Sequence, residues 1–548
     1  MSMELTTINN LELGSAVSVG FIVPFIITTA FALPVFSVFI KRKAFYDIYT
    51  VIVAFIAFID TIINLKLVSD YGAPIVYVFS GWPPPLGIIY EVDYFSAVLG
   101  LLTSFVMLLI VIYSVKYIRD AGYVWYYTLL LGLEAGLLGC LYTGDVFNFF
   151  VMLEVLSISA YALVAYYRSR HQAVEAAMKY AIFGAVATTV YFLAVIFIYA
   201  SYGTLTMADI ALKTRLMKSN IFSNGLFGNI VVASATAIAL ALWAFTYKAA
   251  LFPNHFWLPD AHPEAPTPVS AALSGLVVNV GVYAVVRFMY TLFSGLKLMS
   301  PIRDVILMAL LILGILSGFI AALLMVVQRD VKRLLAYSTV SHIGLIFMGL
   351  SLGFSYLDTR VVNEGLTAAL YHLINHSVGK ALLFLGVGVF IAMAGSRDLD
   401  RLAGLGKINK VAMIAVLIGF LQLMGVPPLG GFFSKLLLYT AFLDAGMPIP
   451  AVMVVVISAI SVLGYIKVID ALWFKPLMRE RVGGYSKLMT YIPFILALVA
   501  IVLGILNPYM TQWLSKVVSY SLSPEGINAY INEFIKVSSN LIKYLGGT

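Results

Sequence analysis

Apolar runs of about 20 residues recur along the whole chain, separated by short polar stretches that carry Lys and Arg. Runs of this length cross a bilayer as helices and are too long to be barrel strands. The pattern therefore predicts about 14 transmembrane helices, followed by a mixed apolar and polar C-terminal segment typical of an amphipathic helix. The predicted spans lie near 17–40, 49–69, 94–116, 123–143, 147–167, 175–201, 229–252, 268–294, 303–327, 333–353, 364–394, 410–442, 450–473 and 489–513.

The composition supports an all-α polytopic membrane protein. Of the 548 residues, 62% are hydrophobic and 11% are charged, and the mean hydropathy is +0.99, which excludes a soluble domain. Cys140 is the one cysteine, so disulfides and Cys-based metal or iron–sulfur sites are excluded, and we expect neither a cofactor nor a metal. The net charge of +8 fits loops at a membrane surface, and no nucleic-acid partner is expected.

The distribution of Lys and Arg predicts an orientation. If both termini lie outside the cytoplasmic membrane, the cytoplasmic loops hold 18 of these residues and the external loops hold 6. Cytoplasmic loops are normally enriched in Lys and Arg, so we expect both termini outside. The first span lacks the basic start of a cleavable signal peptide, and we expect it to be retained.

Two stretches of nearly equal length divide most of the chain. Spans 4–8 occupy 123–294 and spans 9–13 occupy 303–473, and the odd number of helices in each inverts the second relative to the first. The fourth helix of each unit, span 7 or span 12, is interrupted. We therefore predict two inverted five-helix repeats, preceded by helices 1–3 (1–122) and followed by the last helix and an amphipathic tail (474–548). Broken helices at a repeat interface point to a binding or conduction site.

Ionisable side chains inside the predicted spans supply the candidate chemistry. A charged side chain in mid-membrane costs about 2.5–3.5 kcal/mol, which implies partners, water or function. A desolvated lysine can alternate between charged and neutral forms, and histidine titrates near neutrality, so both suit a proton relay. His372, His376 and Lys380 are four residues apart each time, which places them on one face of a helix. The candidates are Glu154, Lys248, His372, His376, Lys380 and Lys435, with Asp60 and Glu134 as further intramembrane acids.

Structural explanations compete with these functional ones. Glu154 and Lys248 could form a static ion pair that ties two helices together. The two histidines could be hydrogen-bonded core residues. Lys332 stands at the cytoplasmic edge of a span, where its amine could extend to the surface.

Five ordered motifs resemble one known family. They are LYTGDVFNFFVMLE (141–154), PNHFWLPDAHPEAPTPVS (253–270), DVKRLLAYSTVSHIG (330–344), YHLINH (371–376) and PPLGGFFSK (427–435). The chain resembles the antiporter-like subunits shared by Mrp-type Na⁺/H⁺ antiporters, respiratory complex I and membrane-bound hydrogenases. The stretches GWPPP (81–85), DYFS (93–96) and GDVFN (144–148) are most similar to the D-type subunit of the Mrp antiporters and to the related archaeal complexes. The resemblance implies 14 helices with two inverted repeats, as the spacing does.

The resemblance also implies residue roles. Glu154 would modulate Lys248, the relay of the first half-channel, and Lys435 would be the terminal relay of the second. His372, His376 and Lys380 would connect the two. Lys332 matches a basic position of the family, whereas Asn279 stands where many members have a bridging lysine, and an amide cannot change charge. With Glu134, which has no assigned role, these residues are accessory candidates.

The function implied is proton translocation, with Na⁺ as a second candidate ion, by a subunit without a redox centre of its own. Its expected partners are the lipid bilayer and other membrane subunits of an Mrp-type or complex I/hydrogenase-like assembly. Three alternatives stay open: a self-contained solute or cation transporter, a catalytic redox subunit, and a structural paralogue that has lost conduction. The missing cysteine ligands argue against the redox subunit, and Asn279 keeps the non-conducting paralogue open.

Overall fold

The computed structural model describes residues 2–216, 230–477 and 483–546, and nearly all of them are helical. Lys218, Arg479 and Arg481, which contribute to the charge count used for orientation, lie outside these ranges. The first part comprises α1 (Ser2–Phe39), α2 (Lys43–Tyr71), the antiparallel hairpin β1 (Ile75–Val78) and β2 (Ile89–Val92), and α3 (Tyr94–Tyr117).

The middle of the chain adds α4 (Tyr123–Tyr142), α5 (Val146–Val164), α6 (His171–Tyr202), α7 (Met207–Leu216), α8 (Ile230–Lys248), α9 (Leu258–Glu264), α10 (Thr267–Ala272) and α11 (Val278–Val286). Two π-helical turns, Leu273–Val277 and Arg287–Leu292, flank α11. The last part comprises α12 (Ser300–Val327), α13 (Val331–Leu350), α14 (Thr359–Ala394), α15 (Lys410–Met424), α16 (Gly430–Asp444), α17 (Pro448–Ile469), α18 (Lys487–Ile505), α19 (Asn507–Leu522) and α20 (Pro524–Gly546).

The described ranges contain 13 helices that are long and apolar enough to cross a membrane. The predicted span near 410–442 is not among them because it is broken into α15 and α16, which are too short singly. With this broken helix as the fourteenth, the prediction of an all-α polytopic membrane protein with about 14 spans is confirmed.

Both predicted interruptions are present, and local backbone chemistry explains them. After α8 ends at Lys248, Ala250 has a φ of 54° and Pro253 follows. After α15, Gly425 has a φ of 84°, a conformation that favours glycine, and Pro427 and Pro428 lack the amide hydrogens that a continuing helix needs. Each break interrupts the regular hydrogen bonds of a helix, and such breaks are tolerated inside a membrane only in buried or wet surroundings.

Two spans lie wholly inside the protein. Every residue from Thr267 to Leu292 is buried, and so is every residue of α14 from Gly365 to Phe390. A helix that is apolar nearly all round is expected in such a position. The polar side chains on these spans therefore face neighbouring helices and not lipid.

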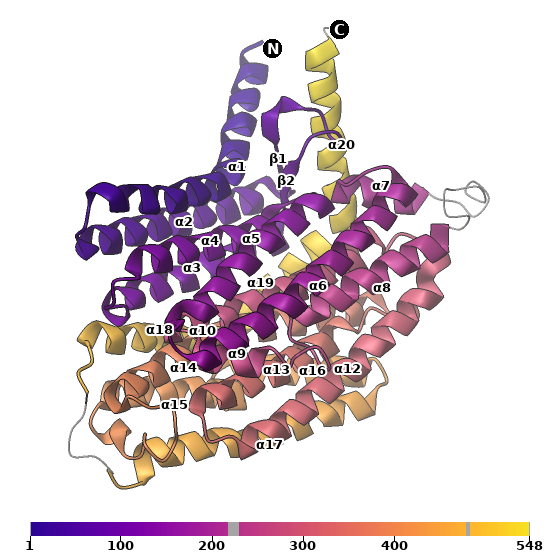
Figure 1. The fold of residues 1–548 in the computed structure, drawn as a ribbon. Coiled ribbons are helices and arrows are strands. Elements are labelled where there is room, and N and C mark those ends of the chain that lie inside the picture. Colours follow the sequence, from indigo (N-terminus) through magenta and orange to yellow (C-terminus); the bar gives the residue numbers. More distant parts are fainter. Residues whose placement is uncertain (1, 217–229, 478–482, 547–548) are drawn as a thin grey trace.

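The chain ends lie beside the hairpin (Figure 1). The predicted amphipathic tail corresponds to α20, whose apolar residues Ile527, Tyr530 and Phe534 are buried. Helix α20 packs on α7 and on β1, so its apolar face covers protein. The boundaries of the two predicted repeats stay predictions.

Candidate functional site

A series of buried polar side chains connects α14, α13 and α17. Lys380 on α14 is fully buried, and its Nζ donates to Ser338 Oγ at 2.5 Å and to the carbonyl of Leu335 at 3.1 Å. Ser338 is hydrogen-bonded to the hydroxyl of Tyr465 on α17, and that hydroxyl lies 3.0 Å from His342 Nε2. Each hydroxyl both donates and accepts, so a proton can pass along it.

The same series continues through two stacked imidazoles to the second broken helix. His342 Nδ1 lies 3.0 Å from His372 Nε2, and His372 Nδ1 lies 3.0 Å from Ser434 Oγ. Ser434 precedes Lys435 in α16. We call Lys380, Ser338, Tyr465, His342, His372 and Ser434 the histidine line, and all six are at most 1% exposed. It brings two of the predicted residues, Lys380 and His372, into one hydrogen-bonded series that ends beside a third.

Both predicted relay lysines lie at the carbonyl end of a broken helix. Lys435 Nζ donates to the carbonyls of Leu423 at 2.7 Å and Met424 at 3.2 Å, the last two residues of α15. Lys248 is itself the last residue of α8. The carbonyl end of a helix carries partial negative charge and favours a cation, which offsets part of the cost of burying an amine.

Lys248 contacts α5 without forming an ion pair. It is 2% exposed, and its Nζ donates to Ser157 Oγ at 2.5 Å and to the Tyr161 hydroxyl at 3.3 Å. Glu154 stands nearly one turn before Ser157 on α5, but within the described ranges no ion pair joins it to Lys248. The static pair is therefore absent from this structure, and the modulating role of Glu154 stays a prediction.

His376 and Asn279 lie next to the histidine line but outside its hydrogen bonds. The His376 ring centroid is 5.9 Å from that of His342, and neither His376 nitrogen has a hydrogen-bond partner in the described part of the chain. Asn279 Nδ2 donates to Ser377 Oγ at 2.8 Å and to the Gly275 carbonyl at 2.7 Å. The position where the resemblance predicts a bridging lysine therefore contacts α14 through a neutral amide.

The other two accessory candidates differ in their surroundings. Lys332 is 2% exposed, and its amine donates to the carbonyls of Ala265 at 2.6 Å and Pro263 at 3.4 Å, so it points inward and does not extend to the surface. Glu134 on α4 is fully buried, and neither carboxylate oxygen has a hydrogen-bond partner among the described residues.

The sequence prediction missed four members of the histidine line: Ser338, His342, Tyr465 and Ser434, the last of which precedes the predicted Lys435. Ser338 and His342 are four residues apart in α13, the same spacing as the predicted His372 and His376, and this repeat of polar residues was the available signal. Tyr465 lies in the apolar run of α17. An aromatic residue in such a run gives no sign that its hydroxyl will meet a histidine.

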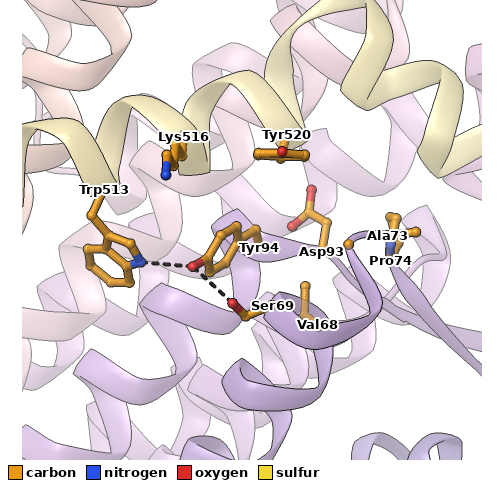
Figure 2. A pocket seen from close by; sticks show the side chains of 10 residues that line it. Val68, Ser69, Ala73, Pro74, Asp93, Tyr94, Trp513, Lys516 and Tyr520 are labelled. Carbon is orange, nitrogen blue, oxygen red and sulfur yellow. Dashed lines mark hydrogen bonds between the residues drawn. The ribbon is translucent and has the colours of Figure 1, made fainter.

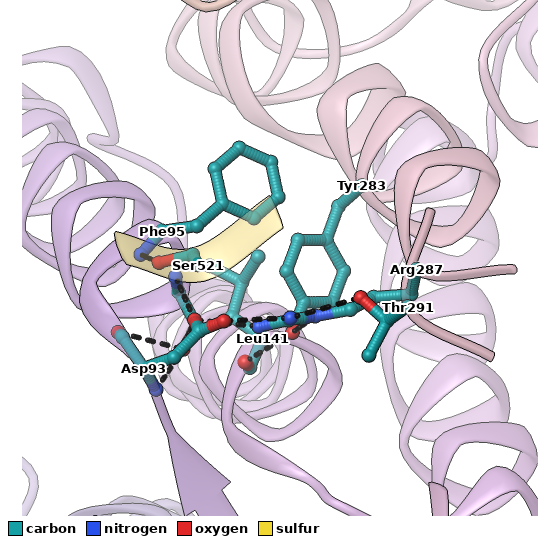
Figure 3. Close-up of polar contacts among 8 residues, drawn as sticks. Asp93, Phe95, Leu141, Tyr283, Arg287, Thr291 and Ser521 are labelled. Carbon is teal, nitrogen blue, oxygen red and sulfur yellow. Dashed lines mark hydrogen bonds and ion pairs between the residues drawn. The ribbon is translucent and has the colours of Figure 1, made fainter. Parts of the chain in front are cut away.

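A buried ion pair lies where α3 begins (Figure 3). Arg287 binds Asp93 through two hydrogen bonds, at 2.7 and 2.6 Å, and its Nε donates to the Tyr283 hydroxyl at 2.9 Å. Asp93 also accepts from the Ser96 amide at 2.9 Å and so caps α3. Nearby Glu91 in β2 is 1% exposed, and burial raises the pKa of its carboxyl well above the usual range, partly offset by the charge of Arg287.

A cavity of about 270 Å³ opens beside this ion pair (Figure 2). Asp93, Tyr94, Trp513 and Lys516 are among its lining residues, and Trp513 Nε1 donates to the Tyr94 hydroxyl at 2.8 Å. No member of the histidine line borders it. The cavity therefore belongs to the junction of α2, α3 and α19 and not to the predicted path.

Residues 143–461 match the family described as NADH:quinone oxidoreductase/Mrp antiporter, TM. The chain belongs to this family. It is 34% identical over 468 residues to the N subunit of NADH-quinone oxidoreductase from Desulforudis audaxviator, covering 82% of this chain and 88% of that protein. It is 30% identical over 486 residues to the D-type subunit of the Na⁺/H⁺ antiporter from Alkalihalophilus pseudofirmus, covering 87% and 92%.

Solved structures contain the same fold. A chain of the membrane-bound sulfane sulfur reductase, an archaeal respiratory membrane complex, superposes with a TM-score of 0.83 at 28% identity, over 94% of this chain and 99% of that chain. The family resemblance expected from the five motifs is thereby confirmed, and it extends to both the quinone-reductase and the antiporter branches.

Proposed function

We propose that this protein is a proton-translocating membrane subunit of a multi-subunit complex. The unbroken histidine line, which ends beside Lys435, is the observation that carries the proposal. Two relatives are named as subunits of a Na⁺/H⁺ antiporter and of NADH-quinone oxidoreductase, which supports transport of protons or Na⁺ together with other membrane subunits.

In the second half, Lys380 and Lys435 serve as the proton-carrying ends of the line. Hydroxyls and imidazoles join them, and each of these groups can accept a proton on one side and release one on the other. Lys435 gains and loses its proton at the carbonyl end of α15. The partial negative charge of this helix end favours the charged lysine until the proton is passed on. A proton taken up by one of the two lysines, Lys380 or Lys435, makes that lysine repel the charge on the other. This Coulomb repulsion promotes release of a proton from the second lysine.

In the first half, Lys248 is the relay and Glu154 the carboxylate that modulates it. Ser157 and Tyr161 hold the amine in this structure. A rearrangement of one helical turn would bring the amine toward Glu154, and the resulting attraction would favour the charged lysine. Alternation between these partners would load and unload the first half-channel.

The two halves meet at Asn279 and Ser377. Because an amide neither gains nor loses a proton in the physiological range, transfer across this contact needs water or the unpartnered nitrogens of His376. Lys332, whose amine donates to the carbonyls of Pro263 and Ala265, is an accessory cation of the path.

We also propose the two inverted repeats, 123–294 and 303–473, and a location in the cytoplasmic membrane with both termini outside. The position of a broken helix and its lysine in each unit supports the repeats. The excess of Lys and Arg in the loops that would be cytoplasmic supports the orientation.

Transport by the assembled complex in proteoliposomes tests the proposal. Lys248→Ala and Lys435→Ala should each abolish coupled proton movement, reported by a pH-sensitive dye, while the complex still assembles. Lys467→Ala is a matched control, because Lys467 also donates to backbone carbonyls, those of Val326 and Gln328, but lies outside the path. It should transport like the wild type.

Several outcomes would overturn the assignment. Full transport by both single variants would show that Lys248 and Lys435 are not part of the path. A wild-type complex without proton flux would favour the non-conducting paralogue. Transport by the chain alone in liposomes would instead support the self-contained transporter.

A further inference from the structure

A compact group of oxygen atoms lies between α1 and α2, away from the histidine line. Ser18 Oγ is 3.1 Å from Asp60 Oδ1 and 2.7 Å from Asn64 Oδ1. Asn64 Nδ2 donates to the other carboxylate oxygen, Asp60 Oδ2, at 2.8 Å. Asp60 is 8% exposed and Asn64 is fully buried, near the middle of the spanning helix α2. The acid was singled out as intramembrane from the sequence, yet the proposed relay does not use it.

This group has too few hydrogen atoms to place one in each of its close oxygen–oxygen contacts. Ser18 has one hydroxyl hydrogen but faces two acceptor oxygens, on Asp60 and Asn64. One of these two close oxygen–oxygen contacts therefore has no hydrogen between its atoms while Asp60 is ionised. A positive species at the group would remove this repulsion, and it would also compensate a carboxylate that is otherwise costly inside a membrane.

An independent feature points to the same place from α4. The Tyr142 side chain is fully buried, and its hydroxyl lies near Asn64 and Asp60 but makes no hydrogen bond of ordinary geometry with a described residue. Gly100 on α3 makes room for it, because a Cβ there would stand 2.5 Å from the Tyr142 oxygen. The hydroxyl is thus a fourth oxygen beside the group.

The donor set defines the ligand. Hard cations prefer oxygen ligands, and one carboxylate with three neutral oxygens balances a single positive charge. Ser18 faces Asp60 from α1, Tyr142 is the titratable side chain that faces it from α4, and on α3 Ser104 bonds to the neighbouring Thr61. No ion pair in the described part of the chain includes Asp60, so no basic side chain already neutralises it.

We propose that Ser18, Asp60, Asn64 and Tyr142 form a Na⁺ site. The site goes beyond the proposed proton relay, whose residues it does not contact. Na⁺ bound here neutralises the carboxylate and joins α1, α2 and α4.

Equilibrium binding of ²²Na⁺ to the purified complex, in Na⁺-free KCl buffer, tests the site without turnover. Asp60→Asn should bind one Na⁺ fewer per complex than the wild type. Asp47→Asn is the matched control, because Asp47 lies on the same helix but pairs with Lys43 at 2.5 Å, and it should bind like the wild type.

Two milder variants keep the test decisive if Asp60→Asn fails to assemble. Ser18→Ala and Tyr142→Phe each remove one oxygen, and each should raise the dissociation constant by about tenfold, the equivalent of about 1.4 kcal/mol. Unchanged Na⁺ binding in both would overturn the proposal. So would equal stoichiometry in Asp60→Asn and wild type, or a wild-type complex that binds no Na⁺. Because binding is measured at rest, these results do not depend on whether Lys248 and Lys435 carry protons.

Discussion

Replacement of Asp93 by Asn should destabilise the protein strongly, because it removes one charge of a buried ion pair and little else. The side chains of Asp93 and Arg287 are 1% and 2% exposed, and two hydrogen bonds of 2.7 and 2.6 Å join them. Asn has nearly the same shape and is a good N-cap, so the hydrogen bond to the Ser96 amide at the start of α3 can persist. What is lost is the compensation of the Arg287 charge.

The expected cost follows from the surroundings of that charge. Removing one partner of a buried ion pair costs about 3–5 kcal/mol, since the other charge stays buried. Arg287 keeps some support, from the Tyr283 hydroxyl at 2.9 Å and from the faces of Phe95, Tyr283 and Tyr530 at 5.7, 5.0 and 5.5 Å. These contacts place the expected loss at the lower end, about 3 kcal/mol.

Asp145 offers a matched control. It caps α5 by accepting from the amides of Phe147 at 2.8 Å and Asn148 at 2.7 Å, and it is 5% exposed, but no described arginine or lysine pairs with it. Asp145→Asn should therefore cost less than about 1 kcal/mol, because the cap is retained and no buried cation is left alone.

The measurement is the free energy of unfolding in mixed micelles titrated with SDS. In a double-mutant cycle, Asp93→Asn with Arg287→Met should be more stable than Asp93→Asn alone, giving a coupling energy of at least about 2 kcal/mol. Equal losses for Asp93→Asn and Asp145→Asn, or additive effects in the cycle, would refute the reasoning.

Three further predictions concern other buried groups. His342→Phe should cut proton flux by at least about tenfold without loss of assembly, since it breaks the line between Tyr465 and His372; undiminished flux in proteoliposomes would exclude the line as the path. Asn279→Lys should assemble and transport, because an amine can replace the donor to Ser377, whereas a misfolded product on gel filtration would show a dry, tightly packed site. Burial raises the pKa of Glu91, so the folded protein holds a proton on this carboxyl that the unfolded chain releases above about pH 4.5. The stability of the wild type therefore falls as the pH rises above this value. Glu91→Gln should remove that loss of stability, and parallel pH profiles of the unfolding free energy in wild type and variant would contradict the prediction.

Features visible in one segment of sequence were predicted well. The breaks after Lys248 and before Lys435 follow from Pro and Gly within apolar runs, and the lysines themselves stand out because charge is rare there. The span count and the family followed from the same local patterns. None of these predictions needs knowledge of which helices are neighbours.

The contacts that complete the site were not predictable in this way. Tyr465 reaches His342 from a residue 123 positions away, and Asp93 reaches Arg287 across 194 positions. The sequence indicated His372, His376 and Lys380 as a series along one helix, but the hydrogen bonds leave α14 after Lys380 and return through His342 to His372. Helical spacing gives a shared face, and the partner helix decides which residues on it are connected.

The charges of the histidine line explain how it would act as a unit. It joins Lys380 and two imidazoles to a serine beside Lys435, and none of its described hydrogen bonds involves a carboxylate. Without a fixed negative charge, two charged amines in one buried series repel each other and lack compensation, so occupation of one end opposes occupation of the other. The first half differs, because Glu154 stands on the helix that holds Lys248. In the proposed pathway, an excess proton would therefore be stabilised in the first half and passed on in the second, so that the two halves would differ in role.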